Sequence, residues 1–171
     1  QTIFQLLYFY DEIDFSLRDD GKINRTSGNE DILISNDLMI KSAKKLKHYR
    51  QTNCGVDIKI LKKIPKGGGL GGGSSNAATT LIALNKLWNL KLTNTELISI
   101  GKDIGADVPV FIEGRSSWAE GIGEILTPLN LPEYFYLVVS INKQISTREI
   151  FSHKALTMSP LQRKITDFSL V

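Results

Sequence analysis

The stretch that decides the fold of this chain is its glycine-rich segment, Pro65-Lys66-Gly67-Gly68-Gly69-Leu70-Gly71-Gly72-Gly73-Ser74-Ser75. It holds six of the 14 glycines in the 171 residues, interrupted only by Leu70. Before it, apolar and polar residues alternate from 56 to 60, which predicts a half-buried strand. After it, Ser74 or Ser75 is expected to cap a helix whose apolar face runs from Ala77 to Trp88. The glycines therefore join a strand to the N-terminus of a helix.

A glycine loop in this position has the properties of a phosphate-binding site. Its backbone carries few side chains, so it can wrap closely around an anion and present several N–H groups. The following helix adds the positive end of its dipole. Lys62, Lys63 and Lys66 lie beside the loop, and the hydroxyls of Ser74 and Ser75 are expected to reach a phosphate or its magnesium ion. A flexible linker is the alternative, but linkers seldom lead directly into a capped amphipathic helix.

Three common phosphate-binding motifs do not account for the loop. The spacing Gly67-x-Gly69-x-x-Gly72 satisfies the dinucleotide fingerprint, but that motif requires a returning parallel strand, and a second capped helix follows Trp88 instead. A Walker loop requires Gly-Lys followed by Ser or Thr, and the chain has no such triplet. The His-Arg-Asp and Asp-Phe-Gly signatures of protein kinases are also absent from the sequence.

Composition narrows the class of protein further. Hydrophobic residues make up 42% and charged residues 23%, as in an ordinary globular domain. The formal net charge of +3 is too small to argue for nucleic acid or an acidic membrane as a partner. One cysteine, Cys54, excludes an internal disulfide, and two histidines exclude a zinc site built from histidine. Because no apolar stretch has the length of a membrane span and no secretory signal opens the chain, we expect a cytoplasmic protein.

Two further helices carry N-terminal capping signals. Asn36 or Asp37 is expected to cap a helix with Met39, Ala43 and Leu46 on its inner face and lysines on its outer face.

The other helix starts at Thr93-Asn94-Thr95-Glu96, which is a capping box, and is predicted to run to about Ile104. Gly105 then stands where a left-handed C-terminal cap belongs.

Strand-like segments are interspersed with these helices. They are expected at residues 3–10, 15–18, 108–112, 116–120 and 135–141. The segment 108–112 directly follows Asp107 and has Pro109 near its start. The mixture of helices and antiparallel-looking strands predicts an α+β fold.

Three blocks of the sequence resemble the GHMP kinase superfamily. Residues 65–78 resemble its ATP loop, and Gly105-Ala106-Asp107-Val108-Pro109-Val110-Phe111 is similar to the block that carries its catalytic aspartate. A third block, Ala119-Glu120-Gly121-Ile122-Gly123-Glu124-Ile125-Leu126-Thr127-Pro128, follows at the expected spacing. The three glycines on each side of Leu70 resemble one branch of the family, which acts on 4-diphosphocytidyl-2-C-methyl-D-erythritol.

The resemblance implies a fold and a domain division. The fold is the GHMP kinase fold, with a ribosomal protein S5 domain 2-like N-terminal lobe followed by a C-terminal α+β lobe. Residues 1–128 are expected to form the ATP-binding lobe without its first strands, and residues 129–171 the beginning of the C-terminal lobe. The family's opening Pro-x-Lys-x-Asn segment, with its catalytic lysine, and its substrate-binding Tyr-His pair do not occur in the sequence. The chain therefore resembles the middle of the enzyme, and by itself it is expected to be inactive.

The resemblance also implies the chemistry. The expected reaction transfers the γ-phosphate of ATP, with Mg²⁺ as second cofactor, to the 2-hydroxyl of 4-diphosphocytidyl-2-C-methyl-D-erythritol, in the non-mevalonate route to isopentenyl diphosphate. Asp107 is then the catalytic base, although the residues alone favour an aspartate that only satisfies turn amides. Thr147 is the candidate substrate contact, with Arg148 after it where relatives often have proline. ATP is expected to contact Pro65, Lys66, Gly67, Gly68, Gly69, Leu70, Gly71, Gly72, Gly73, Ser74 and Ser75.

Some alternatives stay open at this point. The chain would also fit another GHMP kinase, one that acts on mevalonate or homoserine, or a non-catalytic nucleotide-binding remnant. By similarity, Lys62 is expected near the nucleotide, and either Asn36 or Asp37 stands where the family's adenine contact is found.

Overall fold

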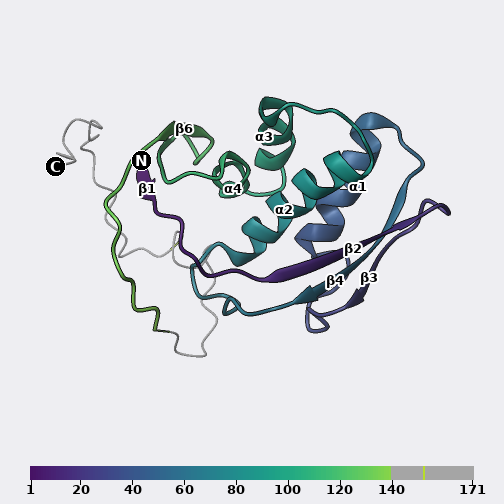
Figure 1. Cartoon of the computed structure of the whole chain (residues 1–171), viewed down its shortest axis with the longest axis horizontal. Coiled ribbons are helices and arrows are strands. Elements are labelled where there is room, and N and C mark those ends of the chain that lie inside the picture. The colour runs from purple at the N-terminus through teal and green to yellow at the C-terminus, as the bar shows by residue number, and fades with distance from the viewer. Residues whose placement is uncertain (140–151, 153–171) are drawn as a thin grey trace.

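Two small sheets and a layer of helices make up the part of the chain that the computed structural model describes, residues 1–139 and Ser152 (Figure 1). In chain order the elements are β1 (Thr2–Phe4), β2 (Glu12–Arg18), β3 (Ile23–Ser27), α1 (Leu38–Arg50), β4 (Gly55–Leu61), α2 (Gly72–Leu87), α3 (Asn94–Lys102), α4 (Val108–Glu113), β5 (Ser117–Glu120) and β6 (Ile125–Pro128). The α+β class is confirmed. Among the described residues, no helix is long and apolar enough to span a membrane.

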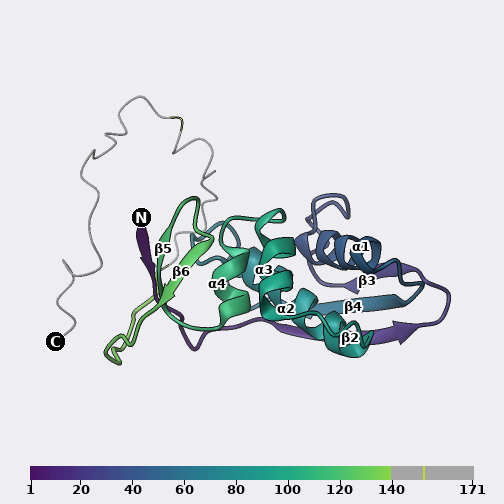
Figure 2. The same ribbon diagram turned by 90° about the horizontal axis from the view of Figure 1, so that it is seen from above.

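The two sheets lie at opposite ends of the described part (Figures 1 and 2). In the larger sheet the order is β2-β4-β3, with β4 antiparallel to β2 and parallel to β3. In the smaller sheet β1, β5 and β6 are antiparallel neighbours in that order. The segment 5–11 runs from one sheet to the other, and the functional residues described below gather around it.

The main core lies between the larger sheet and the helices, which cover one of its faces (Figure 1). The alternation predicted for residues 56–60 is confirmed, because Val56, Ile58 and Ile60 of β4 are buried in this core. The inner residues of α1 and the apolar face of α2 from Ala77 to Trp88 are buried there as predicted.

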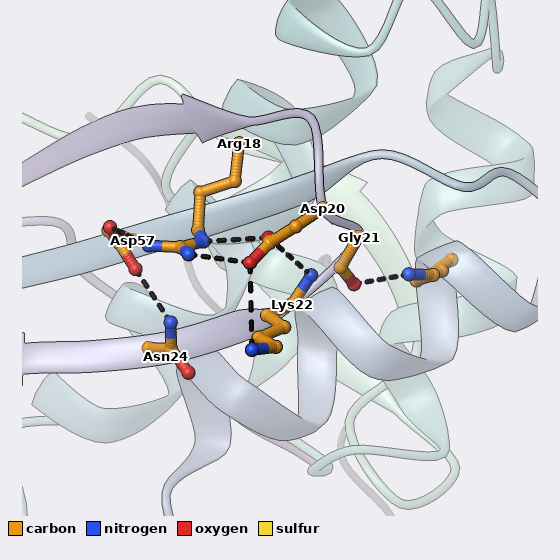
Figure 3. Close-up of polar contacts among 7 residues, drawn as sticks. Arg18, Asp20, Gly21, Lys22, Asn24 and Asp57 are labelled. Atoms are coloured by element: carbon orange, nitrogen blue, oxygen red, sulfur yellow. Dashed lines mark hydrogen bonds and ion pairs between the residues drawn. The ribbon is translucent and has the colours of Figure 1, made fainter.

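The outer face of the larger sheet is polar and cross-linked. Asp57 of β4 accepts hydrogen bonds from Arg18 of β2 (2.7 Å) and Asn24 of β3 (2.8 Å), so its carboxylate ties all three strands together (Figure 3). Both hydrogen bonds hold the pKa of the Asp57 carboxyl below its ordinary value, and the bond from Asn24 has the larger effect. Arg18 also pairs with Asp20, next to the turn at Gly21, and its hydrogen bonds lower the pKa of Asp20.

Asp37, not Asn36, caps α1. Its Oδ1 accepts from the amides of Met39 (2.9 Å) and Ile40 (3.4 Å), and its Oδ2 accepts from the buried guanidinium of Arg25 (2.6 Å). The side chain of Asp37 is therefore buried and fully engaged, whereas Asn36 is exposed.

The expectation of a strand at residues 108–112 is wrong, because these residues form the helix α4. A short apolar run fits a buried strand and a buried helix equally well by periodicity. Pro109 lies in the first turn, where its missing amide costs nothing. The left-handed cap expected at Gly105 is also wrong. Helix α3 ends at Lys102, its C-cap Asp103 has a helical conformation, and the Gly105 amide donates to the Gly101 carbonyl (3.1 Å).

Three other expected boundaries change. Helix α2 begins at Gly72 with Gly71 as its N-cap, so neither Ser74 nor Ser75 is the cap. The strand expected over residues 3–10 is shorter, since β1 ends at Phe4. In the strand expected over 135–141, residues 135–139 form no strand, and 140 and 141 lie outside the described residues.

The capping box of α3 is confirmed and allows a direct test. The Glu96 amide donates to the Thr93 hydroxyl (3.3 Å), and the Thr93 amide donates to the Glu96 carboxylate (2.8 Å). We expect Thr93→Ala to lower the free energy of unfolding by about 1 kcal/mol, because a first-turn amide loses its acceptor. Urea denaturation measures this change. Thr95→Ala, at an exposed position of the same turn, is the matched control, and an equal loss there would contradict the role of the cap.

Candidate active site

A cavity of about 280 Å³ brings together two of the sequence blocks singled out above. Its walls come from the segment that follows β1, from the glycine segment, and from the start of α4. Gly69, Leu70, Gly71 and Ser75 of the glycine segment line it, and so does Asp107. The loop and the aspartate, which are distant in the sequence, therefore face the same space.

The glycine segment adopts a backbone that requires glycine. Gly67, Gly69 and Gly71 have φ angles of 68°, 71° and 65°, in the left-handed region that other residues rarely adopt. A Cβ at Gly69 would have no atom within 4 Å, so this part of the loop borders open space. Gly71 caps α2 without a side-chain hydrogen bond, which leaves the first-turn amides available to an anion.

The glycine segment, the Asp107 block and the third block contact one another. A Cβ at Gly71 would lie 2.9 Å from the ring of Phe111, so the loop packs directly on α4. The hydroxyl oxygen of Ser74 lies 3.7 Å from the Cβ position of Gly105. In the third block, a Cβ at Gly123 would lie 3.1 Å from the carbonyl oxygen of Ala106. The close approach of the Phe111 ring to Gly71, and of the Ala106 carbonyl to Gly123, leaves no room for a side chain at these two positions unless the neighbours shift.

Asp107 lies at the N-cap position of α4 but makes no capping hydrogen bond with its side chain. Its backbone angles, φ −87° and ψ −7°, are near-helical, and the residue is among those that line the cavity. The alternative in which this carboxylate only satisfies the amides of the helix start is not what the structure shows, because the side chain makes no capping hydrogen bond. A residue at this position can offer its carboxylate to a bound molecule as an acceptor of a proton or a hydrogen bond.

Each of the three lysines beside the loop pairs with a carboxylate. Lys63 pairs with Glu12 and Lys66 with Asp31, and both of these pairs are solvent-accessible. Lys62 pairs with Asp11, whose side chain is fully buried. The Lys62 ammonium lies 3.4 Å from the Cβ position of Gly72, at the N-terminus of α2.

Asp11 is the residue of the site that sequence reasoning missed. Besides Lys62, its carboxylate accepts from the amides of Lys63 (2.7 Å) and Ile64 (2.8 Å) and from the side-chain amide of Asn76 (2.9 Å). Burial raises the pKa of the Asp11 carboxyl, but these hydrogen bonds outweigh it, so the pKa lies below its ordinary value. In the sequence the only signal is an aspartate before a strand, and its partners follow only from the strand register and the position of α2.

One expected site residue has no structural test. Thr147, the candidate substrate contact, lies outside the described residues. Within the described ranges, no group of three or more His, Cys, Asp or Glu side chains forms a potential metal site.

Comparison with known proteins identifies relatives of the whole chain. Residues 37–115 match the model of the GHMP kinases N terminal domain. The chain is 60% identical over 169 residues to the 4-diphosphocytidyl-2-C-methyl-D-erythritol kinase of Ruthia magnifica subsp. Calyptogena magnifica, covering 99% of this chain and 59% of that protein. The protein of the same description from Vesicomyosocius okutanii is 56% identical with the same coverage. That from Burkholderia mallei (strain SAVP1) is 47% identical over 168 residues, covering 98% of this chain and 57% of the relative.

A solved structure agrees with these relatives. The crystal structure of a 4-(cytidine 5'-diphospho)-2C-methyl-D-erythritol kinase matches with a TM-score of 0.62 and 34% sequence identity, over 71% of this chain and 42% of that one. The chain thus spans a little under 60% of the length of the curated relatives. Its fold is the mixed α+β fold of the GHMP kinase N-terminal domain, and the chain is similar to these kinases over nearly its whole length.

Proposed function

We propose that the protein containing this chain is a kinase that transfers the γ-phosphate of ATP to the 2-hydroxyl of 4-diphosphocytidyl-2-C-methyl-D-erythritol. One observation carries the proposal: a glycine loop at a helix N-terminus and Asp107 line a single cavity. The substrate is suggested by the printed descriptions of relatives at 47–60% identity over nearly the whole chain. We also propose that residues 1–128 belong to the N-terminal, ATP-binding lobe and that residues 129–171 begin the C-terminal lobe.

The ATP phosphates are assigned to residues 65–75. The left-handed glycines turn the backbone so that its N–H groups can point at an anion, and the uncapped first turn of α2 adds further donors. Lys62 supports this assignment, because its ammonium lies beside the first residue of α2 and can neutralise phosphate charge. The open space at Gly69 is where a side chain would displace a phosphate.

Asp107 is assigned to the acceptor hydroxyl. Phosphoryl transfer has a loose transition state, so the enzyme mainly positions its reactants and neutralises charge. A carboxylate of ordinary acidity suffices to orient the hydroxyl and to take its proton late in the reaction. Asp107 suits this task because it lines the cavity and its carboxylate makes no hydrogen bond that caps α4.

The donor set of the cavity also suits Mg²⁺. This ion takes oxygen ligands, and in kinases it is bound largely by the substrate phosphates with one or two protein groups. Ser75, which lines the cavity, is the candidate protein ligand through its hydroxyl. When bound, the ion would neutralise negative charge that develops on the phosphate oxygens.

The proposed activity is tested by ADP release from the full-length kinase. We expect release with ATP and 4-diphosphocytidyl-2-C-methyl-D-erythritol, and none above background with mevalonate or homoserine as acceptor. Preference for mevalonate or homoserine would assign the chain to another GHMP kinase. ATP binding without transfer to any of the three would favour the non-catalytic alternative.

The role of Asp107 predicts a loss of turnover without a loss of nucleotide binding. In the full-length kinase we expect Asp107→Asn to lower kcat by roughly a hundredfold or more, the scale of a lost proton acceptor. The affinity for ATP by calorimetry should stay near that of the wild type. Asp103→Asn, at an exposed carboxylate four residues earlier, is the control and should leave kcat unchanged. A near-normal kcat for Asp107→Asn would make this residue structural.

The phosphate loop predicts a contrast between two left-handed glycines. Gly69 and Gly114 have nearly equal φ angles, 71° and 70°, and a Cβ at either would meet no atom within 4 Å. Substitution by Ala should therefore lower stability by a similar amount at both positions, about 1–2 kcal/mol. Only Gly69→Ala should also weaken ATP binding, measured by calorimetry. Equal ATP affinities in the two variants would contradict the assignment of the ATP phosphates to this loop.

A further inference from the structure

We propose that Asp11 is a positioning residue for the nucleotide: its carboxylate holds the two ends of the glycine segment, and the Lys62 ammonium between them, in the arrangement that receives the phosphates. This inference rests on the proposed function and concerns the same site. Asp11 belongs to none of the sequence blocks that mark the site, and it reaches the loop from the segment between the two sheets.

One oxygen of Asp11 fixes the point where the chain enters the loop. Strand β2 begins at Glu12, which pairs with Leu61, so Asp11 lies just beyond the last paired residues of β2 and β4. From there its Oδ1 accepts from the amides of Lys63 and Ile64. These are the last two amides before Pro65, which has none. The backbone is thus held until the glycines begin.

The other oxygen reaches the far end of the loop. Oδ2 accepts from Asn76, one turn into α2, and from the Lys62 ammonium. The two ends also touch: a Cβ at Gly72 would lie 3.0 Å from the Ile64 Cγ2 atom. The Asp11 carboxylate and the close contact between Ile64 and Gly72 therefore set the separation of the two ends of the loop. The glycines between these ends can adjust their backbone to a bound ligand.

The negative charge of the Asp11 carboxylate has a role besides holding the ends of the loop. The Lys62 ammonium and the N-terminus of α2 are both positive and lie side by side, an arrangement that is unfavourable unless an anion is near. Asp11, with 0% of its side chain exposed, supplies that negative charge before the nucleotide arrives. It thereby keeps Lys62 beside Gly72, where a phosphate can also contact it.

The substitution Asp11→Asn separates this role from simple packing. Asparagine has nearly the same shape, but it has one acceptor oxygen and one donor amide in place of two acceptor oxygens. It can serve the amides of Lys63 and Ile64, or Lys62 and Asn76, but not both pairs. One end of the loop is therefore released while the volume of the side chain is preserved.

The experiment compares the full-length wild-type kinase with Asp11→Asn and with Asp14→Asn. Asp14 is the matched control, since it lies three residues later, on the edge strand β2, with 78% of its side chain exposed. Calorimetry with Mg-ATP and steady-state kinetics give the ATP affinity and the two KM values. We expect Asp11→Asn to weaken ATP binding and raise the KM for ATP by about tenfold or more, the scale of one lost hydrogen bond to a charged group. The KM for the alcohol should change by less than about twofold, and Asp14→Asn should match the wild type.

KM distinguishes positioning from stability, because it does not depend on the fraction of enzyme that is folded. A lower melting temperature or apparent kcat for Asp11→Asn with an unchanged KM for ATP would overturn the proposal. Asn76→Ala is the second variant: it keeps the charge and releases only α2, so it should raise the KM for ATP by less than Asp11→Asn does. Failure of both variants to fold would also overturn it, since these contacts would then hold the domain together.

The outcome is separable from that of the proposed function. If the wild type binds ATP without transferring phosphate, the proposed function fails, and the ATP affinities of the variants still decide the role of Asp11. If the wild type transfers phosphate and Asp11→Asn binds ATP normally, only this inference fails. A wild type that does not bind ATP would contradict both.

Discussion

The burial of α2 against β4, α1 and α4 is the constraint on which the site depends. Ala77, Ala78, Leu81 and Leu84 have no exposed surface, and small side chains in the first half of this face let the neighbouring elements approach closely. A helix held along its whole length presents its N-terminus at a fixed point. The glycine loop must then span the distance from the end of β4 to that point, and its left-handed residues are the means by which it does so.

The charges around the loop divide into two kinds with different consequences. The pairs Lys63–Glu12 and Lys66–Asp31 are exposed, and exposed ion pairs contribute little because water competes for them. Lysines in such pairs can leave their partners for a phosphate at small cost. The pair Lys62–Asp11 is shielded and shares its carboxylate with two backbone amides and Asn76, so it stays together. The loop therefore combines lysines that can move with one that is held.

The sequence predicted those features that local pattern controls. Alternation over residues 56–60 identified the central strand, the Thr93 capping box identified α3, and the glycines with their flanks identified the loop. The local sequence pattern was insufficient to predict features that depend on tertiary packing. Residues 108–112 are apolar enough to be buried as a strand or as a helix. In the structure they form a helix, and Phe111 of this helix contacts Gly71 of the loop. Asp11 was missed because its four partners come together only through the β2–β4 register and the position of α2.

The change from strand to helix at residues 108–113 matters for the chemistry. With a strand there, Asp107 would have stood at a strand end with no particular relation to α2. As a helix, α4 begins at the cavity, and so does α2: Gly71 and Asp107 are the N-caps of the two helices, and both line it. Two helix N-termini then converge on one space, with amides suited to a phosphate on one side and a free carboxylate suited to a hydroxyl on the other. Phe111, packed on Gly71, fixes the distance between the two. The proposed transfer requires a phosphate-binding group and a hydroxyl-binding group at a constant separation, and the packing of Phe111 on Gly71 supplies that separation.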